Sequence, residues 1–123
     1  MSGRPRARTD GRTATWWLLE RAEAERSVSG FSTALGTGGE RSPHVDELTR
    51  ARLDAALDHL AKVDDRCDAI IGALRETAKP WTATVAEAHY LRGLTWEAAA
   101  ALAGYSGRHA QDVVGAALDE IVA

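Results

Sequence analysis

The feature that most constrains the fold is the stretch from residue 94 to residue 109, LTWEAAAALAGYSGRH, which predicts a helix, a sharp turn and a second helix. Thr95 occupies an N-cap position, where its hydroxyl can accept from amides of the first turn, and Glu97 places a negative charge near the helix N-terminus. Gly104 ends this helix, because a residue without Cβ adopts the left-handed conformation at low cost. Ser106 can then cap the second helix. Two helices separated by about three residues have the spacing of a helix-turn-helix.

The second helix has a clear apolar face. Its apolar residues recur at steps of three and four, which predicts one buried stripe: Ala110, Val113, Val114, Ala117, Leu118 and Ile121. The remaining positions are expected to face outwards: Arg108, His109, Gln111, Asp112 and Gly115. Upstream, apolar residues at helical spacing predict a supporting helix that stops at Gly93. The C-terminal part is therefore predicted to be a three-helix unit.

The same residues resemble a known family. Residues 90–97 (YLRGLTWE), the turn Gly104-Tyr105-Ser106 with Arg108, and Ala117-Leu118 are similar to the C-terminal domain of small phage and prophage proteins of the ArpU/RinA type. The resemblance implies a domain like region 4 of sigma factors and a role in the activation of late phage genes. It extends more weakly over the rest of the chain, as an N-terminal helix, a Ser/Gly loop and a long helix.

A helix-turn-helix places the N-terminal end of its second helix in the major groove, where side chains read base edges and surrounding groups hold phosphates. Arg108 is suited to a guanine, Gln111 to an adenine, and the capped helix end to a phosphate. The expected DNA-binding residues are Thr95, Trp96, Ser106, Gly107, Arg108, His109, Gln111 and Asp112.

The charge of this unit opposes DNA binding. Residues 81–123 carry two arginines against five carboxylates, a net charge of −3 with His neutral. The family usually has basic residues along the outer face of the second helix, where this chain has Asp112, Gly115 and Ala116. At a salt slope of about 0.9 per neutralised phosphate, two arginines per protomer give a dimer a slope of only about four. Typical specific binders make about 6–10 phosphate contacts.

The first twelve residues supply positive charge. They contain four arginines against one aspartate, a net charge of +3, and the arginines are Arg4, Arg6, Arg8 and Arg12. Glycines and a proline in this segment work against regular structure, so residues 1–12 are predicted to be a disordered basic arm. Such an arm can follow a DNA backbone; the alternative is a frayed terminus with incidental charge.

Residues 13–79 are predicted to form a helical hairpin. A helix is expected from residue 13 to about 29, a flexible Gly/Ser loop over residues 30–44, and a long helix over about 43–77. The long helix carries an unbroken heptad seam: Leu53, Ala56, Leu60, Val63, Cys67, Ile70 and Leu74. This seam requires another helix against it. The first helix can return antiparallel, or a second copy can form a homodimer, and hydrophobic periodicity does not choose between them.

Three further features of the hairpin have two interpretations each. Trp16 and Trp17 are adjacent and cannot share a face, so either one is exposed or meets a partner chain, or both tuck under neighbouring elements. Cys67 lies on the seam and is expected to be a small buried hydrophobe rather than a reactive thiol. The carboxylates of the long helix are expected to be a solvated face. The alternative is a protein-partner face formed by Asp54, Asp58 and Asp65.

Lys79-Pro80 breaks the long helix, because proline lacks an amide donor and restricts the residue before it. The sequence thus predicts an all-α protein with an arm over residues 1–12, a hairpin or coiled-coil region over 13–79, and a helix-turn-helix domain over 80–123. A unit of about forty residues rarely buries enough apolar surface alone, so it is expected to lean on the long helix or on a partner, with Trp81 and Trp96 in that contact.

Other classes of protein find little support. No apolar run approaches the roughly 18 residues of a membrane span and no secretory signal opens the chain, so a soluble, cytoplasmic protein is expected. One cysteine and four scattered histidines give neither an intramolecular disulfide nor a metal-ligand spacing. Residues 37–42 lack the Gly-Lys-Ser/Thr ending of a phosphate loop, and no nucleophile lies near a histidine, so neither a cofactor nor an enzyme is expected.

Two functions stay open at this point. The first is a phage-encoded transcriptional regulator that binds double-stranded DNA through the helix starting at Ser106. The second is an acidic helical module of phage origin that contacts or inhibits a host protein, either a polymerase or a nucleic-acid-binding defence machine.

Overall fold

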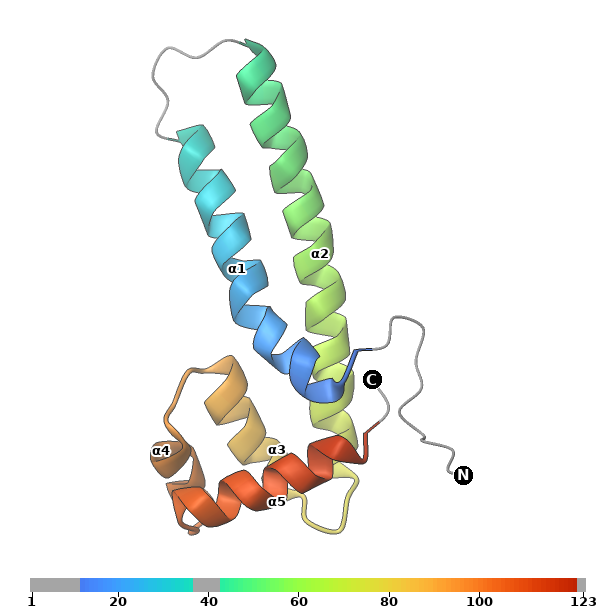
Figure 1. The fold of residues 1–123 in the computed structure, drawn as a ribbon, viewed down its shortest axis with the longest axis vertical. Coiled ribbons are helices and arrows are strands. Elements are labelled where there is room, and N and C mark those ends of the chain that lie inside the picture. Colours follow the sequence, from blue (N-terminus) through green and yellow to red (C-terminus); the bar gives the residue numbers. More distant parts are fainter. Residues whose placement is uncertain (1–11, 37–42, 122–123) are drawn as a thin grey trace.

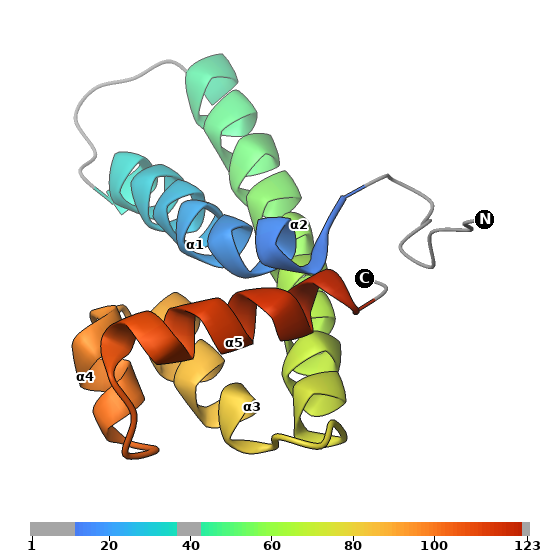
Figure 2. The same cartoon turned by 60° about the horizontal axis from the view of Figure 1, so that its bottom comes forward.

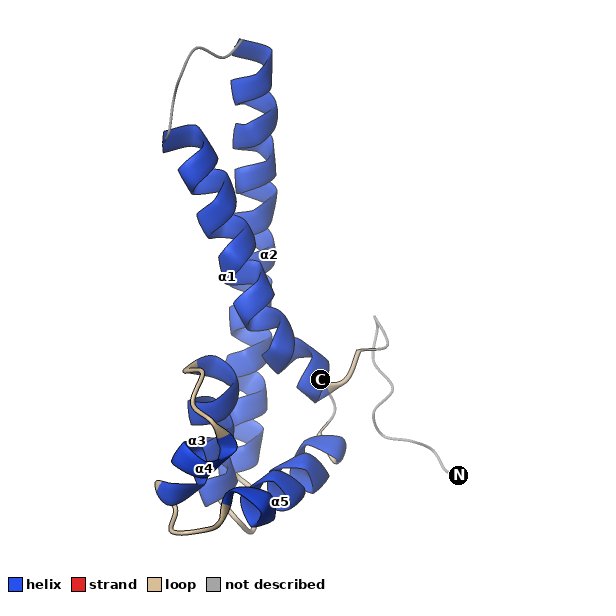
Figure 3. Ribbon diagram, turned by 60° about the vertical axis from the view of Figure 1, so that its left-hand side comes forward, coloured by secondary structure: helices blue, strands red, loops and turns tan. Residues whose placement is uncertain are grey.

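The computed structural model describes residues 12–36 and 43–121, and every regular element in these two ranges is a helix (Figures 1 and 3). The elements are α1 (Ala14–Gly36), α2 (Pro43–Arg75), α3 (Trp81–Ala86), the π-helix η1 (Glu87–Leu91), α4 (Trp96–Ala101) and α5 (Gly107–Asp119). The predicted all-α class is confirmed. The arm arginines Arg4, Arg6 and Arg8 lie outside the described residues. Among the helices described, none combines the length and the apolar character that crossing a membrane requires.

Helix α1 runs antiparallel to α2 and covers the heptad seam from within the chain (Figure 1). The register is fixed near the lower end of the pair, where the Cys67 thiol donates to the Trp17 carbonyl oxygen at 3.4 Å. One turn further along α1, Arg21 pairs with Asp64. The seam residues of the lower half of α2 are fully buried: Val63, Cys67, Ile70 and Leu74.

The prediction that a loop begins at residue 30 is wrong, whereas the expected start of the long helix at about residue 43 is confirmed. Helix α1 continues to Gly36, and α2 begins at Pro43, so only residues 37–42, which lie outside the described residues, separate them. The continuation follows from Phe31, Ala34 and Leu35, whose half-buried side chains extend the contact face by one more turn. A glycine in a helix costs only about 1 kcal/mol, and proline suits the first helical position.

The C-terminal elements pack under the open end of the hairpin, with α5 crossing below the start of α1 (Figure 2). One core cluster contains Leu18 from α1, Leu74 from α2, Val85 from α3, and Val114 and Leu118 from α5. The predicted supporting helix is present as α3 followed by η1, and Gly93 ends it with a φ of +77°. Residues 81–121 therefore share their core with the hairpin.

Candidate functional site

The local signals around the α4–α5 turn are confirmed. The Thr95 side-chain oxygen accepts from the Ala98 amide at 3.1 Å, and the Ser106 side-chain oxygen accepts from the His109 amide at 3.1 Å. Gly104 has a φ of +79°. The amide of Tyr105 donates to the Ala100 carbonyl at 3.1 Å and that of Gly104 to the Ala101 carbonyl at 3.2 Å, the bond pattern of a Schellman C-cap. The turn is thus held by bonds at both helix ends.

The predicted division of α5 into two faces is also confirmed, except at Gly115, which was expected to face outwards and is half-buried. The stripe is buried or half-buried along its whole length: Ala110, Val113, Val114, Ala117, Leu118 and Ile121. Four side chains near the start of the helix are exposed: Arg108, His109, Gln111 and Asp112. These come from the first two turns, so the exposed set lies at the N-terminal end of α5.

Gly107 belongs to the packing between α4 and α5. It is buried, and a Cβ at this position would lie 2.8 Å from Glu97 Oε2 and 3.0 Å from the Glu97 amide nitrogen. Only glycine therefore allows the two helix starts to approach this closely. The Glu97 carboxylate lies beside the positive end of the α5 dipole, where it repels an anion. The expected phosphate site at this helix end is therefore disfavoured.

Trp96 lies in a ring cluster inside the C-terminal unit. Its half-buried ring stacks on His89 at 3.8 Å between centroids and meets Tyr90 edge-on at 5.7 Å. His89 is held in place by a 2.8 Å hydrogen bond between its Nδ1 and the Leu94 carbonyl oxygen. Burial raises the pKa of the Tyr90 phenol. The cluster fixes η1 against α4, whereas Thr95 is exposed at the start of α4.

A second ring cluster holds the turn itself. Trp81, at the start of α3, lies 4.4 Å from Tyr105 and 6.3 Å from His109 between ring centroids, and Tyr105 lies 5.0 Å from His109. Trp81 therefore supports the α4–α5 turn, and it also packs against the core cluster that the C-terminal unit shares with α1 and α2. His109 is exposed but contributes one side to this cluster. In the first two turns of α5, the exposed side chains outside both ring clusters are Arg108, Gln111 and Asp112.

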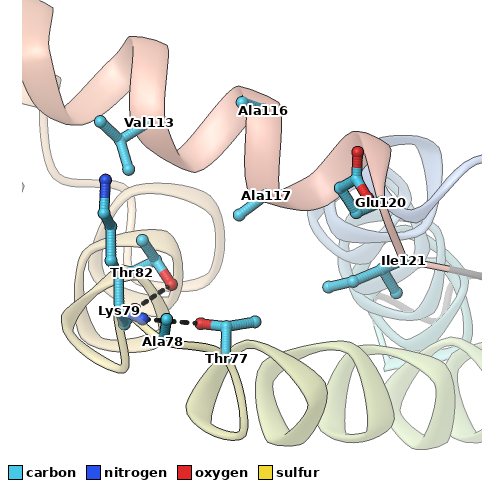
Figure 4. Close-up of a pocket in the computed structure, with 9 residues that line it drawn as sticks. All are labelled: Thr77, Ala78, Lys79, Thr82, Val113, Ala116, Ala117, Glu120 and Ile121. Atoms are coloured by element: carbon cyan, nitrogen blue, oxygen red, sulfur yellow. Dashed lines mark hydrogen bonds between the residues drawn. The ribbon is translucent and has the colours of Figure 1, made fainter.

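Open grooves lie on two sides of α5. On the side of α1 the lining includes Thr15, Trp96, Asp112 and Asp119, so this groove is polar and acidic. On the opposite side a groove runs between α5 and the α2–α3 linker (Figure 4). Its lining is mainly apolar: Thr77, Ala78, Lys79, Thr82, Val113, Ala116, Ala117, Glu120 and Ile121.

The expected protein-partner face lies on the hairpin, away from the α4–α5 turn. Asp54, Asp58 and Asp65 are all exposed, and their spacing of four and seven places them on one side of α2. None of the three forms an ion pair with another residue of the described ranges, whereas Asp64 pairs with Arg21 on α1. Leu57, between them in sequence, is 45% exposed.

Comparisons with protein-family models, curated proteins and solved structures find no match to this chain. Within residues 12–36 and 43–121, no group of three or more histidine, cysteine, aspartate or glutamate side chains is arranged to hold a metal ion. The candidate site is therefore defined by its own geometry, which is an exposed, capped helix start presenting one arginine, one amide and one carboxylate.

Proposed function

We propose that this protein is a phage-encoded transcriptional regulator that binds double-stranded DNA with the first two turns of α5. The observation that carries the proposal is the outward projection of Arg108, Gln111 and Asp112 from a helix whose start is fixed by the Ser106 cap and the Gly104 turn. A major groove about 12 Å wide admits one α-helix. The turn geometry and the exposed α5 start both support a helix-turn-helix that presents α5 to this groove.

The three exposed side chains have complementary preferences for base edges. A guanidinium such as that of Arg108 pairs with guanine O6 and N7, and an amide such as that of Gln111 pairs with adenine N6 and N7. The carboxylate of Asp112 can accept from the cytosine amino group. It also repels phosphates, so α5 is better suited to reading bases than to holding the backbone.

Selection of binding sites from a random duplex library tests this function directly. The selected duplex is then titrated with the wild type, with Arg108→Ala and with the control Arg50→Ala, which removes the same charge from an exposed position of α2. Loss of a bidentate base contact costs about 1–3 kcal/mol, so Arg108→Ala should weaken the selected complex about 5- to 150-fold. The control should leave the preference for the selected site unchanged. A library without enrichment, or equal affinities for wild type and Arg108→Ala, contradicts the proposal.

A second candidate function is recognition of a basic host protein by the hairpin. The observation that favours it is a group of three exposed aspartates around the exposed Leu57, none of which forms an ion pair with a described residue: Asp54, Asp58 and Asp65. Interfaces in protein complexes commonly have a core depleted of charge and a charged rim, which is the arrangement of Leu57 and the three aspartates. A captured host protein should be released by the triple Asp→Asn variant. It should be retained by a variant that neutralises Glu23, Glu76 and Glu120.

A further inference from the structure

The adjacent tryptophans of α1 form a compact pair at the lower end of the hairpin. Trp17 is 0% exposed, and Trp16 is half-buried and packs against the core cluster. Their ring centroids lie 5.0 Å apart and the rings are perpendicular. Both rings thus tuck under neighbouring groups, which is the second of the two sequence-based interpretations.

Three cationic side chains surround this pair. The Arg12 guanidinium lies 4.2 Å from the Trp16 ring centroid, the Arg66 guanidinium 4.9 Å from the Trp17 centroid, and the Lys62 ammonium 5.8 Å from the Trp17 centroid. Arg12 precedes α1, while Lys62 and Arg66 are one turn apart on α2. Arg12, Lys62 and Arg66 are hereafter the cationic patch.

The charges of the patch are accessible to a ligand. Arg12 and Lys62 are exposed and Arg66 is half-buried. Within residues 12–36 and 43–121, Lys62 and Arg66 form no ion pair, in contrast to Arg21, which is paired with both Asp64 and Glu25. Contact with the Trp17 ring holds the stems of Lys62 and Arg66 in place while their charged ends keep donors for an anion. Less side-chain freedom is then lost when the anion binds.

We infer that the cationic patch binds backbone phosphates of the DNA duplex whose bases α5 reads, an inference that rests on the proposed function. The C-terminal unit is acidic, so most phosphate contacts must come from elsewhere in the chain. The start of α1 lies beside the end of α5, where Thr15 and Asp119 line one groove (Figure 2). Since a helix of 13 residues is about 20 Å long, the start of α1 lies about one helix length from Arg108. That length is shorter than one duplex turn of about 34 Å.

The salt dependence of binding separates the patch from the reading helix. The variant Lys62→Gln with Arg66→Gln removes two phosphate contacts, so the slope of log K against log salt concentration should fall by about 1.8. Affinity should fall equally for selected and scrambled duplexes, because backbone contacts carry no sequence information. The matched control, Arg50→Gln with Arg75→Gln, makes the same change in net charge. These exposed arginines lie about 160° (Arg50) and about 180° (Arg75) around α2 from Arg66 and should leave the slope close to that of the wild type.

A charge-retaining variant separates electrostatics from packing. Lys62 and Arg66 also cover Trp17, so the double glutamine variant is compared with Lys62→Arg combined with Arg66→Lys, and thermal unfolding is recorded for both. The swapped variant should restore the wild-type slope. An unchanged slope in the glutamine variant, with the selected duplex still bound and Arg108 still required, overturns the inference and leaves the proposed function standing. A wild type that binds anionic lipid vesicles but no duplex overturns both.

Discussion

Gly107 and Gly115 lie two turns apart on α5 and should respond in opposite ways to an added methyl group. A Cβ at Gly107 would lie 2.8 Å from Glu97 Oε2 and 3.0 Å from the Glu97 backbone nitrogen, whereas a Cβ at Gly115 meets nothing within 4 Å. Gly107→Ala should therefore lower the free energy of unfolding by about 1–3 kcal/mol, as overpacking does. Gly115→Ala should raise it by about 0.5–1 kcal/mol, because alanine is the better helix former.

Urea unfolding followed by circular dichroism measures both changes against the wild type. Two substitutions of the same kind in the same helix make the comparison independent of helix propensity. If Gly107→Ala is as stable as Gly115→Ala, α4 and α5 do not approach each other at Glu97 as closely as described.

Because of Cys67, the free energy of unfolding of the chain should decrease at alkaline pH. Burial raises the pKa of this thiol to about 11, so the folded state favours the neutral thiol more strongly than the unfolded state does. The stabilisation is fully present below the unfolded pKa of about 8.5 and is lost as the pH rises through about 11. The loss should be on the order of 2 kcal/mol at a pH of about 10.5.

A serine at position 67 provides the reference for this measurement, because a hydroxyl does not ionise in this range. The difference in unfolding free energy between the wild type and Cys67→Ser should shrink from neutral to alkaline pH in parallel urea titrations. A constant difference would mean that the thiol does not titrate differently in the two states.

Single-residue predictions succeeded where the chemistry is local. Caps at Thr95 and Ser106 and the left-handed Gly104 follow from residues within three positions of each, so spacing alone was sufficient. The positions of Gly107 and Trp96 depend on how α4 crosses α5 and on the place of His89. No short-range pattern encodes these contacts, which is why both residues were expected among the DNA-binding residues.

At the level of helices, the N-cap of α5 is the element boundary that positions the candidate site. Ser106→Ala removes the acceptor of the His109 amide at 3.1 Å and should cost about 1 kcal/mol of unfolding free energy. Ser27→Ala, at an exposed position inside α1, is the matched control and should change stability by less than about 0.5 kcal/mol. Ser106→Asp should retain most of the wild-type stability, because aspartate also caps helices. Equal stabilities of Ser106→Ala and Ser27→Ala would exclude a stabilising cap.

The same scale shows why the length of α1 was underestimated. Glycine and serine in residues 30–36 suggested a loop, since these residues are poor helix formers. The partial burial of Phe31, Ala34 and Leu35 outweighs the small propensity cost, and such burial is a property of the folded chain. The long helix was predicted well, because its heptad seam runs without interruption from Leu53 to Leu74, through most of the element.

For the whole molecule, the shared core predicts that residues 80–123 do not fold alone. The buried residues of the C-terminal unit are mostly small, with six alanines among them: Ala83, Ala86, Ala88, Ala99, Ala100 and Ala110. Its larger buried side chains, such as Val85 and Leu118, belong to one cluster with Leu18 of α1 and Leu74 of α2. Without α1 and α2 that cluster loses the buried side chains that those helices contribute, Leu18 and Leu74 among them. A chain of about forty residues rarely compensates for such a loss.

The fragment 80–123 should therefore show weak helical circular dichroism and no cooperative thermal transition, whereas the full chain should unfold in a single transition.

Full-length Leu18→Ala and Leu74→Ala should each lower the free energy of unfolding by about 2–5 kcal/mol. In both variants the hairpin and the C-terminal unit should lose structure at the same temperature, because one core supports both. The NMR signals of the Tyr90 and Tyr105 rings report on the C-terminal unit, and helical circular dichroism is dominated by α1 and α2. Separate transitions for these two signals, or a cooperative transition in the fragment, would mean that the α4–α5 site is stable without the hairpin.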